Sequence, residues 1–268
     1  MPPPAARREF PWWLAVAIAA ALVAAAGIAA SDLYSQVLSV VARGVLVTVF
    51  VTVAAFALAS ALGLGIALMG LSRSSWLRQS ARFYVEIIRG VPILVLLFWI
   101  AFAGAPVLVA AWNSLTLPLQ TIGLLDPLLV RDVSLLWRAI IALTIGYSAF
   151  ISEVFRAGIQ SVDPGQVEAA KALGLSRYRR FRHIVMPQAV RTILPPLGND
   201  FVAMVKDSSL VSVLGVADIT QMGKIYAAGS FRFFETYSIV AYIYLILTVG
   251  LSLALRALEN RLRRGRNA

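Results

Sequence analysis

Apolar stretches long enough to cross a lipid bilayer recur along the chain, and they limit its possible folds more than any other feature. A helix needs about 20 apolar residues to cross a hydrocarbon core of roughly 30 Å. Stretches of this kind are Pro11–Ala30, Gly44–Leu71, Val91–Trp112, Leu136–Ile159, Ile193–Val216 and Tyr237–Leu258. Only 14% of the 268 residues are charged, whereas soluble domains are nearer a quarter charged. The chain is therefore predicted to be an all-α polytopic membrane protein and not a large soluble helical domain.

The connections between these stretches alternate in charge. The basic connections carry Arg7 and Arg8; Arg73, Arg78, Arg82 and Arg89; Lys171, Arg177, Arg179, Arg180, Arg182 and Arg191; and Arg261, Arg263, Arg264 and Arg266. The connections between them hold Asp32, Asp126, Asp132, Asp218 and Glu235. Because basic loops stay in the cytoplasm, both termini are predicted to be cytoplasmic. The net charge of +11 then reflects loops beside anionic headgroups, and we expect no nucleic acid partner.

The first apolar stretch has a second interpretation. Arg7-Arg8 followed by an Ala-rich run and Gly27-Ile28-Ala29-Ala30 is also typical of a cleavable signal peptide. Removal of this segment would leave five spans with the same orientation. The chain has no Cys and a single His, so disulfides and a metal site built from several His side chains are excluded.

A polar, basic segment at 163–187 interrupts the apolar pattern on the predicted cytoplasmic side. Asp163 is a suitable N-cap, Pro164 fits the first helical position, and Gln166 stands where a capping-box partner would. A helix from Pro164 to Leu173 with Gly174 after it, and a second helix capped by Ser176 and running towards Met186, are predicted. Pro187 should disturb the backbone before the next span. Such a helix pair could rest on headgroups or dock on another protein; the short, Ala-rich first helix favours docking.

The spacing within this segment carries a resemblance. Its fixed positions are Glu168-Ala169-Ala170, Gly174 and Ile184-Val185-Met186-Pro187. This resembles the EAA loop of ABC importer permeases, in which EAA, three residues, Gly, nine residues and Ile-x-Leu-Pro follow one another. Met186 replaces the usual Leu, a swap that conserves volume and apolar character.

Three further phrases are similar to the polar amino acid branch of that family. They are Glu86–Pro92, with Val91 in place of Thr, Gly158–Gln166, and Lys206–Val213, with Ser208-Ser209 where Thr-Ser is usual. The resemblance covers about Ala42 to Glu259. It implies the type I ABC importer transmembrane fold, with a five-span core and one extra N-terminal span. The implied organisation is a cytoplasmic tail at 1–10, the extra span and an outer loop at 11–41, the transmembrane domain at 42–259 and a basic cytoplasmic tail at 260–268.

The resemblance also implies how the protein works. The chain has no phosphate-binding loop, because that loop needs Ser or Thr after Gly-Lys and Gly223-Lys224 is followed by Ile225. ATP and Mg²⁺ would therefore be bound by partner ATPase subunits. This chain would be a transport subunit with no cofactor of its own. Glu168, Ala169, Ala170, Gly174, Ile184 and Pro187 would form the segment that docks on the ATPase. Two ATPase subunits, a second permease copy or a homologous permease, an extracytoplasmic binding protein and membrane lipid are the implied partners. The implied location is the prokaryotic inner membrane.

The fifth apolar stretch contains the polar residues Asn199, Asp200, Lys206, Asp207, Ser208 and Ser209. Charges at bilayer depth are costly and usually face a cavity or a partner. Asn199 and Lys206 share one helix face, and Asp200 and Asp207 share another. We expect these six residues either to line the substrate pathway or, for Lys206 and a carboxylate, to form a structural ion pair at a subunit interface.

Glu86 and Arg89 precede the third stretch and are candidates for a gate, although Arg89 would equally serve as a topological anchor. Glu153 and Arg156 are three residues apart and should form an ion pair on one helix. Two alternative functions are an importer of the same class for a different solute and a secondary transporter whose basic loop binds lipid. The EAA spacing argues against the secondary transporter.

Overall fold

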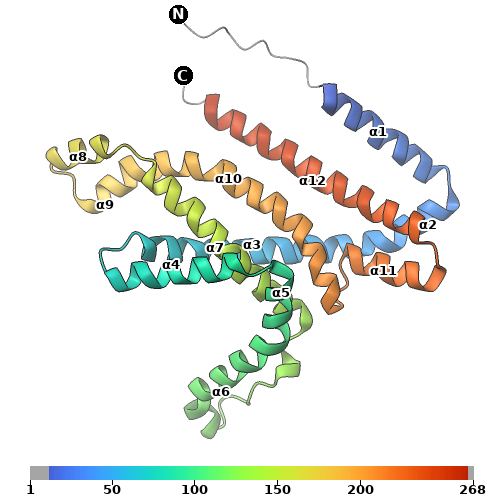
Figure 1. Ribbon diagram of the computed structural model, residues 1–268, viewed down its shortest axis with the longest axis horizontal. Coiled ribbons are helices and arrows are strands. Elements are labelled where there is room, and N and C mark those ends of the chain that lie inside the picture. Colours follow the sequence, from blue (N-terminus) through green and yellow to red (C-terminus); the bar gives the residue numbers. More distant parts are fainter. Residues whose placement is uncertain (1–11, 265–268) are drawn as a thin grey trace, which may run out of the picture.

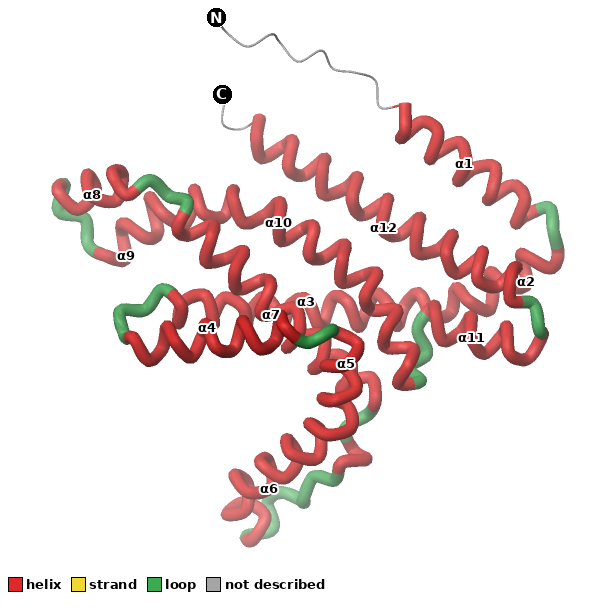
Figure 2. The backbone as a smooth tube through the Cα atoms, in the orientation of Figure 1, coloured by secondary structure: helices red, strands yellow, loops and turns green. Residues whose placement is uncertain are grey.

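The computed structural model describes residues 12–264, with side chains described through Leu258, and every regular element in this range is a helix (Figures 1 and 2). The predicted tail at 1–10 lies outside the described residues, as does the end of the predicted tail at 260–268. The helices are α1 (Trp12–Ala29), α2 (Asp32–Val41), α3 (Val45–Gly70), α4 (Ser75–Gly90), α5 (Ile93–Phe98), α6 (Ala105–Thr121), α7 (Leu135–Gln160), α8 (Pro164–Ala172), α9 (Arg177–Arg180), α10 (Met186–Asp207), α11 (Ile219–Ser230) and α12 (Phe233–Arg264). Short 3₁₀ turns lie at Ala42–Gly44, Val130–Asp132 and Ser208–Leu214, and π turns at Trp99–Gly104 and Phe181–Val185.

Five segments of the described chain are long and apolar enough to cross a membrane. They are Trp12–Ala29, Asp32–Gly70, Ile93–Thr121, Leu135–Gln160 and Phe233–Leu258, and they correspond to five of the six predicted stretches. The predicted span Ile193–Val216 is not among them. Instead α10 begins at Met186 and ends at Asp207, and the rest of that stretch forms a 3₁₀ turn. The reason is its charge, because Arg191 and Lys206 lower the hydropathy of a helix that also carries two carboxylates.

The main core lies where α3 packs along α7, with α5 and α10 covering the pair. Small residues make this contact close: a Cβ at Gly63 would lie 3.0 Å from the carbonyl oxygen of Ser148 and 3.1 Å from the Ile151 side chain. Close approach through small residues is typical of membrane helices, which gain stability from packing and not from expelling water. Gly63 therefore sets the distance between the two central helices.

A second core joins α2, α11 and α12 at the opposite end of the molecule from α8 and α9 (Figure 1). Residues 32–41 are helical here, where the sequence had suggested an outer loop. Buried Asp218 caps α11 by accepting a hydrogen bond from the Gln221 amide at 2.8 Å, and it accepts another from the Tyr244 hydroxyl at 3.1 Å. Thr48 on α3 accepts from the Ile219 amide at 3.2 Å. These bonds fix the start of α11 to α3 and α12.

Helices α5 and α6 form an arm that projects from the body (Figures 1 and 2). The Arg138 guanidinium on α7 holds the base of this arm. It donates to the carbonyl oxygens of Ala101 at 3.0 Å, of Val133 at 2.8 Å and of Val130. Ala101 lies in the π turn between α5 and α6, so one side chain secures the turn and the connection before α7.

The close contact at Gly63 leads to a stability prediction. Gly63→Val should lower the free energy of unfolding by about 1–3 kcal/mol, because added methyl groups overpack a dense interface. Gly65→Val is the matched control, since nothing lies within 4 Å of a Cβ at that position. Denaturant unfolding of the purified proteins in the same detergent checks this, and equal stability of the two variants would contradict it.

Candidate functional site

The segment between α7 and α10 forms a helical hairpin whose turn is well defined. The Asp163 carboxylate accepts a hydrogen bond from the Gly165 amide at 2.8 Å, and the Ser176 hydroxyl accepts one from the Arg179 amide at 3.4 Å, which confirms both predicted N-caps. Gly174 has a φ of +77°. Its amide donates to the carbonyl of Lys171, and the Leu175 amide donates to that of Ala170. This is the Schellman pattern, which favours Gly at the position of positive φ.

Two details of the hairpin differ from the sequence expectation. The predicted capping box is absent, because the Gln166 side chain instead accepts a hydrogen bond from Gln188 on α10 at 2.6 Å. The second helix is also interrupted earlier than expected: α9 ends at Arg180, and a π turn leads into α10. Pro187 explains this turn, because it has no N–H to donate to the carbonyl four residues before it, and a wider turn takes up the mismatch.

The residues of the EAA motif divide into an exposed and a packed group. Glu168 and Ala169 are exposed, whereas Ala170 is 4% exposed and Ile184 is half-buried. Gly174 and Pro187 are exposed. Leu173, at the end of α8, is 80% exposed. This open apolar side chain lies beside the exposed Glu168 and Ala169 positions of the motif, and sequence reasoning missed it, although an apolar residue directly before the turn glycine was a usable signal.

A small apolar cluster attaches the hairpin to the rest of the molecule. Val162, Ala189 and Ile193 form its buried centre, and Val167 and Val185 pack against it. A Cβ at Gly158 on α7 would collide with Ile193 on α10. The base of the hairpin is therefore packed against both long helices, so a displacement of α8 would be transmitted to α7 and α10.

A cavity of about 510 Å³ lies between the α4–α5 junction, α7 and α10. Arg89, Tyr147, Phe150, Asp200 and Asp207 are its polar and aromatic lining. The Tyr147 hydroxyl donates to the Asp207 carboxylate at 2.7 Å, and the Arg89 guanidinium carbon lies 5.4 Å from the centre of the Phe150 ring. One carboxylate oxygen of Asp200 is buried without a hydrogen-bond partner in the described protein. The cavity thus presents both signs of charge on an apolar wall.

The structure brings together only some of the six polar residues predicted on the fifth stretch. Asp200 and Asp207 line the cavity with Arg89, while Asn199 and Lys206 are exposed elsewhere on α10. Ser208 is fully buried, and its hydroxyl donates to the Val205 carbonyl at 2.7 Å. Ser209 is half-buried and does not line the cavity. Lys206 forms no ion pair within the described chain. Tyr147 and Phe150 are cavity residues that the sequence did not single out.

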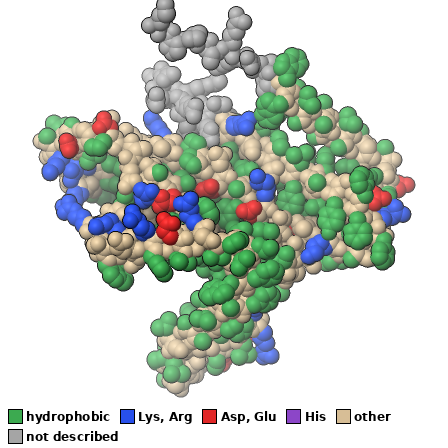
Figure 3. All heavy atoms as spheres, viewed as in Figure 1, with side chains coloured by type: hydrophobic (Ala, Val, Ile, Leu, Met, Phe, Trp, Pro, Cys, Tyr) green, Lys and Arg blue, Asp and Glu red, His purple; other side chains and the backbone are tan. Residues whose placement is uncertain are grey.

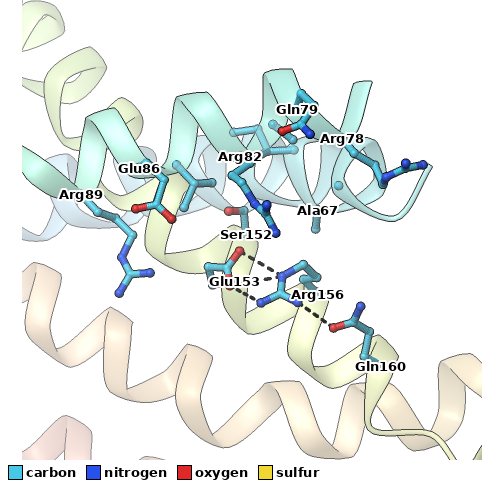
Figure 4. Close-up of a pocket in the computed structure, with 14 residues that line it drawn as sticks. Ala67, Arg78, Gln79, Arg82, Glu86, Arg89, Ser152, Glu153, Arg156 and Gln160 are labelled. Atoms are coloured by element: carbon cyan, nitrogen blue, oxygen red, sulfur yellow. Dashed lines mark hydrogen bonds and ion pairs between the residues drawn. The ribbon is translucent and has the colours of Figure 1, made fainter. Parts of the chain in front are cut away.

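A second cleft of about 350 Å³ lies between α3, α4 and α7 (Figure 4). The predicted ion pair on α7 is confirmed here, because the Arg156 guanidinium donates to the Glu153 carboxylate and, at 2.7 Å, to Gln160. Glu86 and Arg89 also line this cleft, but they form no ion pair with each other. Arg89 therefore borders both cavities.

Comparisons with known proteins agree with this arrangement. Residues 59–264 match the family model described as the inner membrane component of binding-protein-dependent transport systems. The chain is 36% identical over 203 residues to a Bacillus subtilis protein named "Probable amino-acid permease protein", covering 76% of this chain and 82% of that one. It is 37% identical over 224 residues to the glutamine transport system permease protein of Escherichia coli, covering 82% and 92%.

Solved structures of the same fold are also similar. A crystal structure titled as an amino acid ABC transporter with histidines matches with a TM-score of 0.68 and 36% identity, covering 85% of this chain and 95% of that one. An inward-facing methionine ABC transporter matches with a TM-score of 0.65 at 19% identity, covering 87% and 99%, which supports the fold alone. The fold is thus the type I transmembrane fold predicted from the sequence, and the chain belongs to the family of inner membrane components of binding-protein-dependent transport systems.

Proposed function

We propose that the chain is the permease subunit of an ATP-driven ABC importer and that it moves a polar amino acid through the cavity between α4, α7 and α10. The observation that carries the proposal is the combination of Arg89 with Asp200 and Asp207 around one cavity. Its volume of about 510 Å³ is within the range of small-molecule sites. The names of the relatives, which include amino-acid and glutamine permease proteins, support the same class of cargo.

The lining suits a zwitterion, which needs a cation binder and an anion binder in one place. The Arg89 guanidinium can hold a carboxylate through paired hydrogen bonds. Asp207, held by Tyr147, and the unpartnered oxygen of Asp200 can receive an ammonium group. The Phe150 ring and the aliphatic wall offer apolar contact. Asn199, Lys206, Ser208 and Ser209 are not needed for this contact.

Energy for transport would come from two partner ATPase subunits that bind ATP and Mg²⁺. The exposed surface formed by Glu168, Ala169 and Leu173 supports docking on such a partner, because it combines a charge, a small residue and an open apolar side chain. Ala170, Gly174, Ile184 and Pro187 would hold the hairpin in shape. ATP-driven closure of the ATPases would displace α8, and with it α7 and α10, in a rigid-body alternating-access motion.

The remaining parts of the assembly follow from the same proposal. An extracytoplasmic binding protein would deliver the amino acid, and a second permease copy or a homologous permease would complete the pathway. Both termini would face the cytoplasm of a prokaryote. Figure 3 supports this orientation, because Arg and Lys gather at the end of the molecule that carries α8 and α9.

Charge reversal in the hairpin tests the coupling role. Glu168→Arg should lower ATP-dependent uptake by more than about tenfold, because bringing like charges together at an interface costs several kcal/mol. Asp126→Arg, an equal charge reversal in an exposed loop away from the hairpin, is the control. Uptake into proteoliposomes containing the ATPase and binding protein is the measurement, with membrane insertion checked for each variant. Unchanged uptake by the Glu168 variant would remove the coupling role.

Removing the charge of Asp207 tests whether the cavity binds the substrate. Asp207→Asn should raise the KM for uptake about tenfold or more, because an ammonium group loses its charge-assisted hydrogen bond. Asp126→Asn is the matched carboxylate-to-amide control. Labelled glutamate, glutamine and arginine serve as the cargo panel. Transport of none of the three, or uptake driven by an ion gradient without an ATPase, would overturn the proposed function.

A further inference from the structure

The cleft between α3, α4 and α7 contains a concentration of Arg side chains, of which only Arg89 has a place in the proposed transport pathway. Its lining includes Arg78, Arg82, Arg89 and Arg156, against Glu86 and Glu153. The start of α4 and the end of α7, which line the cleft, lie on the side of the molecule that carries the α8–α9 hairpin (Figure 1). From this geometry we infer that the cleft binds the phosphate of an anionic phospholipid headgroup, with Arg82 as its principal ligand and Arg78 as its second.

Two of these four Arg side chains, Arg78 and Arg156, already have partners in the protein. Arg156 is held by Glu153 and Gln160, and one guanidinium nitrogen of Arg78 donates to the carbonyls of Ser72 and Arg73 at 3.0 and 2.7 Å. Arg82 has no ion pair or hydrogen bond within the described residues. Figure 4 shows its guanidinium pointing from α4 across the cleft towards Glu153 and Arg156. All its donors are therefore free to meet an anion.

The charges favour a phosphate over a cation. Four Arg side chains line the cleft against two carboxylates, Glu86 and Glu153, and Glu153 is already paired with Arg156. A guanidinium matches the oxygens of a phosphate with paired hydrogen bonds, and basic pockets between transmembrane helices are suitable sites for anionic headgroups. A volume of about 350 Å³ is at the lower end of small-molecule sites, which suits a headgroup.

The face of α4 beside the cleft indicates that the phosphate belongs to a lipid. Trp76, Phe83 and Ile87 are 75%, 69% and 53% exposed. They fall on one stripe of the helix, and at about 100° per residue this stripe adjoins the stripe of Arg82 and Glu86. The opposite side of α4, with Ala81 and Val85, is buried against Ile66 on α3. Acyl chains can thus lie along the apolar stripe while the headgroup enters the cleft, an arrangement typical of basic amphipathic helices.

Native mass spectrometry of the full chain tests this inference. The protein is purified in detergent with any subunits that accompany it, and phosphatidylglycerol is added. Arg82→Gln should reduce the retained phosphatidylglycerol about tenfold, because charge-assisted hydrogen bonds to the phosphate are lost, and Arg78→Gln should reduce it less. Arg191→Gln, which removes an exposed charge of α10 outside the cleft, should leave retention unchanged.

Two further measurements distinguish the phosphate of a lipid from free inorganic phosphate. Millimolar inorganic phosphate should neither displace the lipid nor raise the melting temperature, and phosphatidylcholine should be retained less than phosphatidylglycerol. Stabilisation by inorganic phosphate without lipid retention, equal retention of both lipids, or an equal loss in the Arg82 and Arg191 variants would each overturn the inference. Lipid retention is measured without transport, so this result and that of the proposed function can fail separately.

Discussion

The need to hydrogen-bond every backbone group in a medium without water governs this structure. Helices meet that need internally, and the described chain is built from helices throughout. At two places where the chain leaves regular helix, polar side chains supply hydrogen bonds to the backbone. Arg138 donates to the π turn between α5 and α6, and Thr48 and Asp218 bond to the amides at the start of α11. These side chains set where the arm and α11 leave the bundle.

Polar side chains inside the bundle follow a different requirement, since a charge at bilayer depth needs a cavity or a partner. On α10 the two carboxylates that share a face line a cavity with Tyr147 and Arg89, and Asp207 accepts the Tyr147 hydrogen bond. On α4 the charged stripe lies between an exposed apolar stripe and a buried one. Arg89 lies in the last turn of α4 and borders both cavities. The two candidate sites are therefore neighbours along one short helix, each with its own set of ligands.

Local signals predicted the hairpin well, because its shape depends on neighbours in sequence. Asp163, Ser176 and Gly174 were predicted as caps and turn residue, and their hydrogen bonds confirm those roles. Gln166 was misassigned because Gln188, far away in sequence, offers a hydrogen bond that competes with the local one. The fifth stretch was predicted at Ile193–Val216, and these bounds were wrong, because α10 begins earlier, at Met186, and becomes a 3₁₀ turn after Asp207. Leu173 was overlooked because its significance depends on exposure.

The sequence by itself determined that this chain crosses a membrane repeatedly as helices, since apolar length and the absence of water leave no other regular structure. It also determined the hairpin, through spacing and capping residues. Only the tertiary structure decided which charges share a space. Asp200 and Asp207 line one cavity with Tyr147 and Arg89, whereas Asn199 and Lys206, equally polar and on the same helix, do not. The physical reason is that a cavity is made by helices distant in sequence, and their packing selects which face of α10 it includes.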